Sequence, residues 1–392
     1  MPAADGGPWA ARIAERLDAV RAEGRWRRTR TFDALGPVGR LAPDDGPAGG
    51  SDPTDVVSFA SNDYLGLSAH PAVIAAAHDA LDRWGAGATA SRLVVGSRPP
   101  HADLEAALAG WKGTEAALVL PTGFAANLAV LTSLAGPGTR ILSDELNHAS
   151  IVDGCRAARG DVEVVPHGDL DALAARLTDD RRPTVVVVDA VYSMDGDAAD
   201  LSRLAGLCTR HGAALVVDEA HSVFGPDLDP ADHPDLTLVR VGTLSKALGS
   251  LGGFVASTAA VRDLLVNVAR PFIFTTGLSP ADTAAAAAAL EIVRSPAGDA
   301  LRARLRRHVD RLRPGHPSPI VPIVLGDEAA AVAAADRLLA AGLHVPAIRP
   351  PTVPPGTSRL RVTFSAAHTD DQVDRLVTAL RYIWGLTPDV TP

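Results

Sequence analysis

Lys246 is the residue whose type most clearly offers chemistry. It lies in VGTLSKALGSLGG, and Lys112 and Lys246 are the only lysines among 37 lysine and arginine residues. An amine can lose its proton and form a Schiff base with a carbonyl group, whereas a guanidinium cannot. Lys246 follows an apolar run and precedes glycines, where ligands of open α/β sheets bind. We therefore predict a nucleophilic role for Lys246; an ordinary surface lysine in a loop is the alternative.

Asp218 and His221 form a second candidate pair. Asp218 ends the apolar run AALVVD, and His221 follows three residues later. A carboxylate in this place could keep the nitrogen of a pyridine ring protonated, which makes the ring an electron sink. His221 could then hydrogen-bond a hydroxyl group on the ring. The alternatives are a carboxylate that caps the next helix and a histidine that is simply structural.

Two further segments could bind an anion or an aromatic ring. PTGFAANLAVL is typical of a strand end, a glycine turn and a helix start, so the backbone N–H groups of Gly123 and Phe124 could bind a phosphate. The hydroxyl groups of Thr243 and Ser245 could contribute to the same site. His148 in SDELNHASIVDG could stack on a pyridine ring, although a capping histidine is the alternative.

These residues occur in a fixed order after strand ends, together with Ser193 in VYSMDGD. A nucleophilic lysine, a carboxylate for a ring nitrogen and a phosphate-binding turn are the parts that pyridoxal 5'-phosphate (PLP) requires. The series therefore predicts a PLP site at the carboxyl edge of a sheet, and no metal.

The elements that would position this site alternate between apolar runs and helical patterns. Such runs, with helices between them, predict a largely parallel sheet that is covered on both faces. The expected strands span residues 116–122, 140–144, 162–167, 183–190, 213–221, 236–244 and 252–258. We predict three parts: an N-terminal helix (9–30) and loop (36–54) in residues 1–55, a large cofactor-binding domain in 56–290, and a smaller α+β domain in 291–392.

Composition and charge argue against several classes of protein. A formal net charge of −9 disfavours a nucleic-acid-binding surface. The stretch ADTAAAAAALEIV is too short to span a bilayer, which takes about 20 apolar residues, and the first residues lack the pattern of a secretory signal. Cys155 and Cys208 are the only cysteines, which favours a reducing cytoplasm over a disulfide framework.

Several of the same stretches resemble the α-oxoamine synthase family of fold-type I PLP enzymes. The matching motifs are SNDYLGLS, PTGFAAN, NHASIVDG, VYSMDGD, VVDEAH, GTLSKALG and RPPTVPPGTSRLRVTFSAAHT, in the order of the family. The resemblance implies an α/β fold with a mostly parallel sheet, a smaller C-terminal α+β domain and a homodimer with active sites at the interface. The RPPTVP tract is most similar to the branch that condenses L-alanine with a pimeloyl thioester, carried on CoA or a carrier protein, in biotin synthesis.

The resemblance also implies a role for each matching residue. Lys246 would form the Schiff base and move the Cα proton, acting with His148, Asp218 and His221. The cofactor set comprises Asp218 at the pyridine nitrogen, His148 on the ring, Ser193 and His221 at the hydroxyl, Gly123, Phe124, Thr243 and Ser245 at the phosphate, and Thr275 or Thr276 from a partner subunit. The substrate set comprises Asn62 and Arg361 at the amino-acid carboxylate, and Arg27 (or Arg28) and Thr352 at the thioester.

Other reactions of the same family stay open at this point. Glycine C-acetyltransferase, 5-aminolevulinate synthase and serine palmitoyltransferase share the fold and cofactor, and a non-catalytic PLP-binding module is a more distant alternative. Two segments depart from the family pattern. HSVFGPDLDPADH replaces a glycine-rich run, and Ala90 stands where a glycine is common. Both lie in loops that could shape the channel for the thioester.

Overall fold

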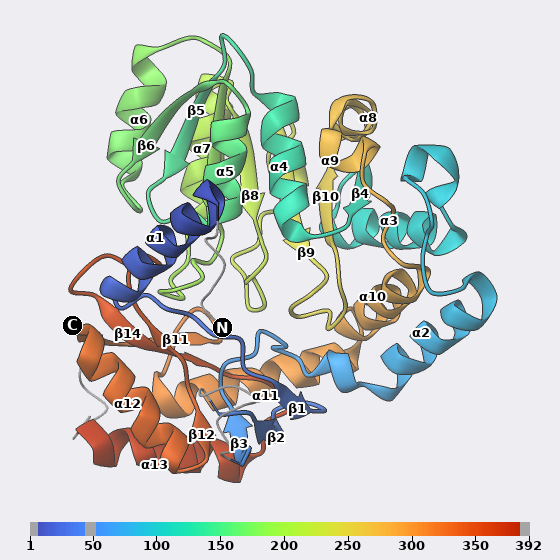
Figure 1. The fold of residues 1–392 in the computed structure, drawn as a ribbon. Coiled ribbons are helices and arrows are strands. Elements are labelled where there is room, and N and C mark those ends of the chain that lie inside the picture. The colour runs from blue at the N-terminus through green and yellow to red at the C-terminus, as the bar shows by residue number, and fades with distance from the viewer. Residues whose placement is uncertain (1–6, 44–51, 385–392) are drawn as a thin grey trace.

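The computed structural model describes residues 7–43 and 52–384 (Figure 1). A seven-stranded sheet forms its centre, in the order β4-β10-β9-β8-β7-β5-β6, and only β10 runs against the other strands. This confirms the predicted, largely parallel sheet. The strands are β4 (Ala116–Leu120), β5 (Arg140–Asp144), β6 (Asp161–Val165), β7 (Thr184–Asp189), β8 (Ala214–Asp218), β9 (Leu238–Thr243) and β10 (Gly253–Ser257).

Both faces of the sheet are covered by helices, as the continuous apolar strands require. All six residues of β7, TVVVVD, are buried. One face packs against α4 (Gly123–Leu134), α5 (Ala149–Ala157), α8 (Ala259–Val268) and α9 (Arg270–Ile273). The other packs against α6 (Leu170–Asp179) and α7 (Leu201–His211), and near β4 against α3 (Pro99–Lys112). The long α10 (Pro280–Val293) packs on α2 (Pro71–Trp84) and α3.

A smaller sheet with the order β11-β14-β13 lies at the C-terminal end of the chain, below the large sheet in Figure 1. It consists of β11 (Ile320–Gly326), β13 (Ala347–Ile348) and β14 (Ser358–Thr363), and is joined by α11 (Pro296–Leu312), α12 (Glu328–Ala340) and α13 (Asp370–Trp384). The six residues of β14 are all buried, which fits its position as the central strand. This arrangement confirms the smaller α+β unit, while the domain boundaries at residues 55 and 290 stay a prediction.

The N-terminal segment differs from the prediction. A loop was expected over residues 36–54, of which 44–51 lie outside the described residues. Within the rest, β2 (Val38–Leu41) pairs with β1 (Phe32–Ala34) and with β3 (Thr54–Ser58). The C-terminal β12 (Leu343–His344) then pairs in parallel with β3. The turn-forming residues that predicted a loop thus include those of a hairpin, whose partner strand comes from nearly 300 residues later.

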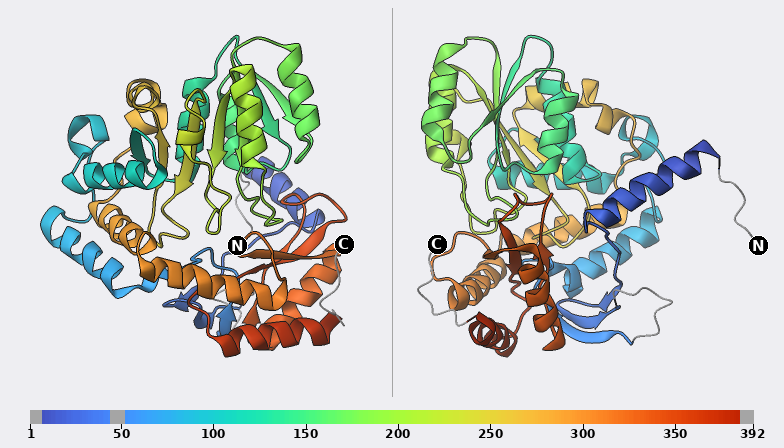
Figure 2. Two further views of the ribbon diagram at one scale, coloured as in Figure 1. Left: turned by 180° about the vertical axis from the view of Figure 1, so that it is seen from behind. Right: turned by 60° about the vertical axis from the view of Figure 1, so that its left-hand side comes forward.

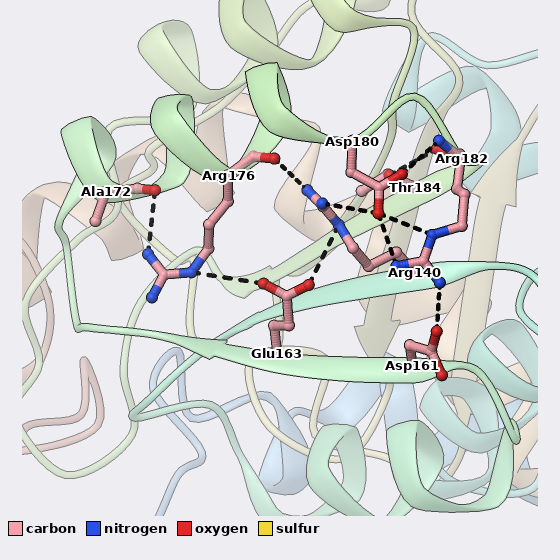
Figure 3. Close-up of polar contacts among 8 residues, drawn as sticks. All are labelled: Arg140, Asp161, Glu163, Ala172, Arg176, Asp180, Arg182 and Thr184. Atoms are coloured by element: carbon pink, nitrogen blue, oxygen red, sulfur yellow. Dashed lines mark hydrogen bonds and ion pairs between the residues drawn. The ribbon is translucent and has the colours of Figure 1, made fainter.

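The amino ends of β5 and β6 are fixed by a network of charged side chains (Figure 3). Arg140 begins β5, and its side chain is only 3% exposed. It donates a hydrogen bond to the carbonyl oxygen of Arg176 in α6 at 2.5 Å and pairs with Asp180 at 3.3 Å. Arg182 holds Asp180 from the other side at 2.7 Å. A buried guanidinium needs such partners because its desolvation is unfavourable, so the network anchors the sheet at the end opposite the predicted site.

The first helix, α1 (Pro8–Ala22), has no buried residue and stands out from the body of the chain (Figure 2, right). Its apolar side chains are exposed, among them Trp9 and Ile13 at 76% and 55%. This single chain therefore leaves an apolar helix face uncovered. None of the helices in the described part of the chain has the length and apolar character needed to cross a bilayer.

Candidate active site

Two buried carboxylates lie side by side at the carboxyl ends of β7 and β8, because Asp189 is the register partner of Asp218. Asp218 accepts a hydrogen bond from the Asn127 side-chain nitrogen at 2.6 Å and one from the Ala220 backbone at 2.9 Å. Asp189 accepts one from the backbone of His148 at 2.7 Å. No helix follows Asp218 directly, so it does not act as the helix cap considered from sequence.

Lys246 and His221 meet at this edge. The Nζ atom of Lys246 lies 2.8 Å from Nε2 of His221, and Nδ1 of His221 lies 2.5 Å from the hydroxyl of Tyr64. Tyr64 is fully buried, and burial raises the pKa of its hydroxyl. Gly249 permits the turn after Lys246, since its φ is +60° and a Cβ atom would lie 2.3 Å from the Ser68 nitrogen.

Asn62 and Arg361 also come together there, from segments 299 residues apart. Arg361 in β14 donates to the Asn62 side-chain oxygen at 3.1 Å and to the carbonyl oxygen of Ser193 at 2.6 Å. The hydroxyl of Tyr64 donates to the same Asn62 oxygen at 3.1 Å. Arg361 is 5% exposed. A buried guanidinium whose partners here are neutral can bind a carboxylate strongly.

The predicted phosphate-binding residues lie around the start of α4. Thr122 caps this helix, with its hydroxyl accepting from Ala125 N at 3.0 Å, so the preceding N–H groups of the first turn stay available. A Cβ atom on Gly123 would lie 3.4 Å from Cβ of Thr243, which places that N–H end beside β9. The hydroxyl groups of Thr243 and Ser245 are 2.7 Å apart.

His148 is the N-cap of α5. Its Nδ1 accepts from the Ser150 backbone at 3.2 Å and lies 2.7 Å from the Ser150 hydroxyl. Asn127 contacts that hydroxyl at 2.8 Å and also holds Asp218, so the capping histidine is linked to the carboxylate. The capping role considered from sequence is therefore observed, and ring stacking by His148 stays a prediction.

Burial controls the protonation of the central groups. It lowers the pKa of Lys246, an effect that the carboxylates of Asp218 and Asp189 partly oppose. Burial, followed by the charges of Lys246 and Arg361, lowers the pKa of His221 well below its usual value. Burial and the neighbouring Asp218 raise the pKa of Asp189 well above its usual value. The site thus favours a neutral imidazole and a lysine that loses its proton readily, the form that attacks a carbonyl carbon.

The second lysine, Lys112, has a different position. Its Nζ lies 2.6 Å from Glu219, the residue after Asp218, and 3.8 Å from the ring centre of Trp111. Arg240 in β9 holds the other oxygen of Glu219 at 2.5 Å and also pairs with Asp227. Asp227 belongs to the segment that departs from the family pattern, so this buried cluster fixes that loop to the strand end behind the site.

A second lock holds the loop that carries Ser193. His167 lies between two carboxylates, 2.9 Å from Asp144 and 2.9 Å from Asp197. On the other side of the loop, Asp195 pairs with Arg359 of β14. A cavity of about 180 Å³ beside His167 is lined by apolar residues of the sheet, α6 and α7 and by none of the predicted site residues.

Five predicted residues lie on the surface in the single chain. Thr275 and Thr276 are exposed, and Thr276 bridges to Ser91. These two were expected to act on a partner subunit. Thr352 is exposed in the loop before β14. Arg27 and Arg28 line a surface hollow with Arg21 and Trp26, just after α1.

Sequence reasoning missed three residues of the site. Tyr64 lies inside the quoted SNDYLGLS motif, but a buried tyrosine carries no distinct signal. Asp189 ends PTVVVVD as Asp218 ends AALVVD, so the same strand-end argument could have found it. Asn127 shows its role only through the fold, because its partner Asp218 is 91 residues away.

The comparisons with known proteins agree with this geometry. Residues 54–380 match the family model "aminotransferase class I and II". The chain is 47% identical to an 8-amino-7-oxononanoate synthase of Anaeromyxobacter dehalogenans, over 97% of this chain and 96% of that relative. A serine palmitoyltransferase from S. paucimobilis, solved with PLP bound, is 30% identical with a TM-score of 0.84, covering 95% and 96% of the two chains. An 8-amino-7-oxononanoate synthase from Francisella tularensis is 25% identical with a TM-score of 0.69, covering 84% and 99%.

Proposed function

We propose that this chain, which belongs to the aminotransferase class I and II family, joins L-alanine to a pimeloyl thioester with loss of carbon dioxide. The products would be 8-amino-7-oxononanoate and a free thiol. Within the family the chain is a PLP-dependent transferase of the α-oxoamine synthase group. One observation carries the choice of reaction: the 47% identity to an 8-amino-7-oxononanoate synthase extends over nearly the whole of both chains.

The residues present at the sheet edge fit PLP. Asp218 is a fixed, buried carboxylate that suits a protonated ring nitrogen. The start of α4, with the hydroxyl groups of Thr243 and Ser245, suits a phosphate. Lys246 suits the aldehyde, and His221 lies within reach of the same position. When bound, the cofactor supplies an electron sink for the bonds at the substrate α-carbon.

The chain's own residues would then divide the work as follows. Arg361 and Asn62 hold the carboxylate of the amino acid and so fix the orientation of its α-carbon. Lys246, once the substrate amine has replaced it, takes the α-proton, for which its low pKa is favourable. Asp218 keeps the ring nitrogen protonated. The positions of Arg27 (or Arg28) and Thr352 are proposed to meet the acyl thioester.

We also propose that the enzyme acts as a homodimer. The exposed apolar face of α1 supports this, because an apolar patch of this kind marks an interface. Thr275 or Thr276 of one subunit would reach the phosphate in the other. The cytoplasmic location inferred from Cys155 and Cys208 stays a prediction.

Serine palmitoyltransferase is the second candidate, because its structure superposes on this chain with the higher of the two TM-scores. Thiol release by the PLP-loaded protein separates the possibilities. We expect fast release with L-alanine and pimeloyl-CoA, and little with L-serine and palmitoyl-CoA or glycine and acetyl-CoA. Preference for either of the latter pairs would overturn the proposed substrates. A pimeloyl carrier protein tested beside pimeloyl-CoA identifies the donor.

The role of Lys246 has a separate test. Lys246→Ala and Lys246→Arg should both lose turnover and the absorbance of covalently bound cofactor, since neither side chain can form the bond. The arginine variant retains a positive charge and similar length, so it controls for electrostatics. Turnover in either variant would refute the assignment.

A further inference from the structure

A buried tyrosine connects the two halves of the site. The hydroxyl of Tyr64 lies 2.5 Å from Nδ1 of His221 and 3.1 Å from the side-chain oxygen of Asn62. His221 in turn contacts Lys246, and Asn62 contacts Arg361. One hydroxyl group therefore stands between the carboxylate-binding pair and the cofactor-binding lysine. All five side chains come from segments that the fold brings together.

The number of protons on these groups is fixed. The low pKa of His221 means a neutral ring with one N–H group, and the high pKa of Tyr64 means an un-ionised hydroxyl with one O–H group. A neutral imidazole has one donor and one acceptor nitrogen. The Asn62 oxygen can only accept. Two hydrogen-bond arrangements then satisfy all the distances.

In the first arrangement Tyr64 donates to Asn62 and accepts from Nδ1–H of His221. The Nε2 atom is then an acceptor and binds the ammonium group of Lys246. In the second arrangement Tyr64 donates to Nδ1, and Nε2 carries the proton. The two arrangements hold the same number of protons, so the change requires only rotation of the hydroxyl and a change of imidazole tautomer.

We propose that Tyr64 is a positioning residue that sets which ring nitrogen of His221 carries the proton. This rests on the roles proposed above for Lys246 and His221. When Lys246 is bonded to the cofactor, it no longer presents an ammonium group to Nε2, and the ring oxygen of the cofactor requires a donor there. The Tyr64 hydroxyl stabilises that tautomer by donating to Nδ1. The same rotation withdraws its proton from Asn62, which couples the carboxylate-binding pair to the lysine.

The pH dependence of the bound cofactor's absorbance tests this. A donor at Nε2 stabilises negative charge on the ring oxygen and thereby lowers the proton affinity of the nitrogen that joins Lys246 to the cofactor. Tyr64→Phe weakens the donor tautomer, so the midpoint should rise by about one pH unit, a tenfold change in proton affinity. The charged groups that face Lys246, namely Asp218, Asp189 and Arg361, are unchanged in this variant.

Two controls separate this role from packing. Tyr192→Phe removes a hydroxyl from another buried tyrosine, outside the site, and should leave the midpoint unchanged. In a His221→Gln background, Tyr64→Phe should cause no further change, because the effect passes through the imidazole. An unchanged midpoint in Tyr64→Phe, or an equal rise in the His221→Gln background, would overturn the proposal.

If Tyr64→Phe does not fold, Asn62→Ala provides the test with the opposite expectation. It removes the competing acceptor, so the hydroxyl must donate to His221 and the midpoint should not rise. A rise in Asn62→Ala would contradict the proposal. Wild-type protein without a Lys246-dependent absorbance band would refute the proposed function itself, whereas a normal band with an unmoved midpoint would refute only the role of Tyr64.

Discussion

His167 offers the sharpest test of the electrostatics. Hydrogen bonds to Asp144 and Asp197 raise the pKa of its imidazole from 6.5 to about 10. Each unit between the folded and unfolded pKa values is worth about 1.4 kcal/mol, so the lock contributes roughly 4 kcal/mol at pH 7 before screening. The Asp197 side chain is 43% exposed, and solvent screening reduces the contribution. We therefore expect His167→Gln to lower the free energy of unfolding by about 2 kcal/mol at pH 7.

The pH dependence of this difference has a definite sign. A raised folded-state pKa stabilises the protein fully below the unfolded pKa of 6.5 and loses the effect as pH rises through about 10. The difference between wild type and His167→Gln should therefore be largest at pH 6 and nearly absent at pH 10. Urea unfolding at each pH, followed by circular dichroism, gives the two free energies.

An exposed histidine provides the matched control. His78→Gln in α2 should change the free energy of unfolding by less than about 0.5 kcal/mol at every pH. A His167→Gln difference that stays constant between pH 6 and pH 10 would show that packing, and not the imidazolium charge, stabilises the loop. The charge argument would then be refuted.

Two more substitutions test how the loops behind the site are held. Glu219→Gln leaves the buried cations of Lys112 and Arg240 without their shared carboxylate and should destabilise the chain by about 3–5 kcal/mol in urea unfolding, against less than about 0.5 kcal/mol for the exposed Glu15→Gln. Equal effects would contradict a buried ion cluster. Gly196→Ala should lower the stability by more than about 2 kcal/mol, because φ is +70° and the new Cβ would lie 2.1 Å from the Ile320 carbonyl oxygen. A wild-type melting curve would refute that close approach.

Local patterns account for most of the large sheet. The run TVVVVD predicts a strand buried on both faces, and β7 is such a strand. The glycine turn before α4 and the carboxylate at the end of β8 were likewise recognisable, since each depends on a few adjacent residues. Their convergence follows from the parallel order of the strands, which places their carboxyl ends at one edge.

Contacts between distant segments could not be predicted from such patterns. The hairpin of β1 and β2 lies in a Gly- and Pro-rich stretch and is completed through β3 by β12. The donation from Tyr64 to His221 joins residues 157 positions apart, and neither position has a periodic signal. The role of Thr275 or Thr276 depends on a second subunit, which one chain does not contain.

The burial of Lys112 under Glu219 has a practical consequence for chemical labelling. Of the two lysine side chains, one is held in an ion pair with 10% of its surface exposed, and the other is the candidate cofactor lysine. Amine-directed reagents should therefore modify side chains almost entirely at Lys246. Reductive trapping with borohydride followed by peptide mapping would have a single expected target, and protection of that target by PLP would report cofactor occupancy. A composition that avoids lysine thus makes the native chain its own site-specific probe.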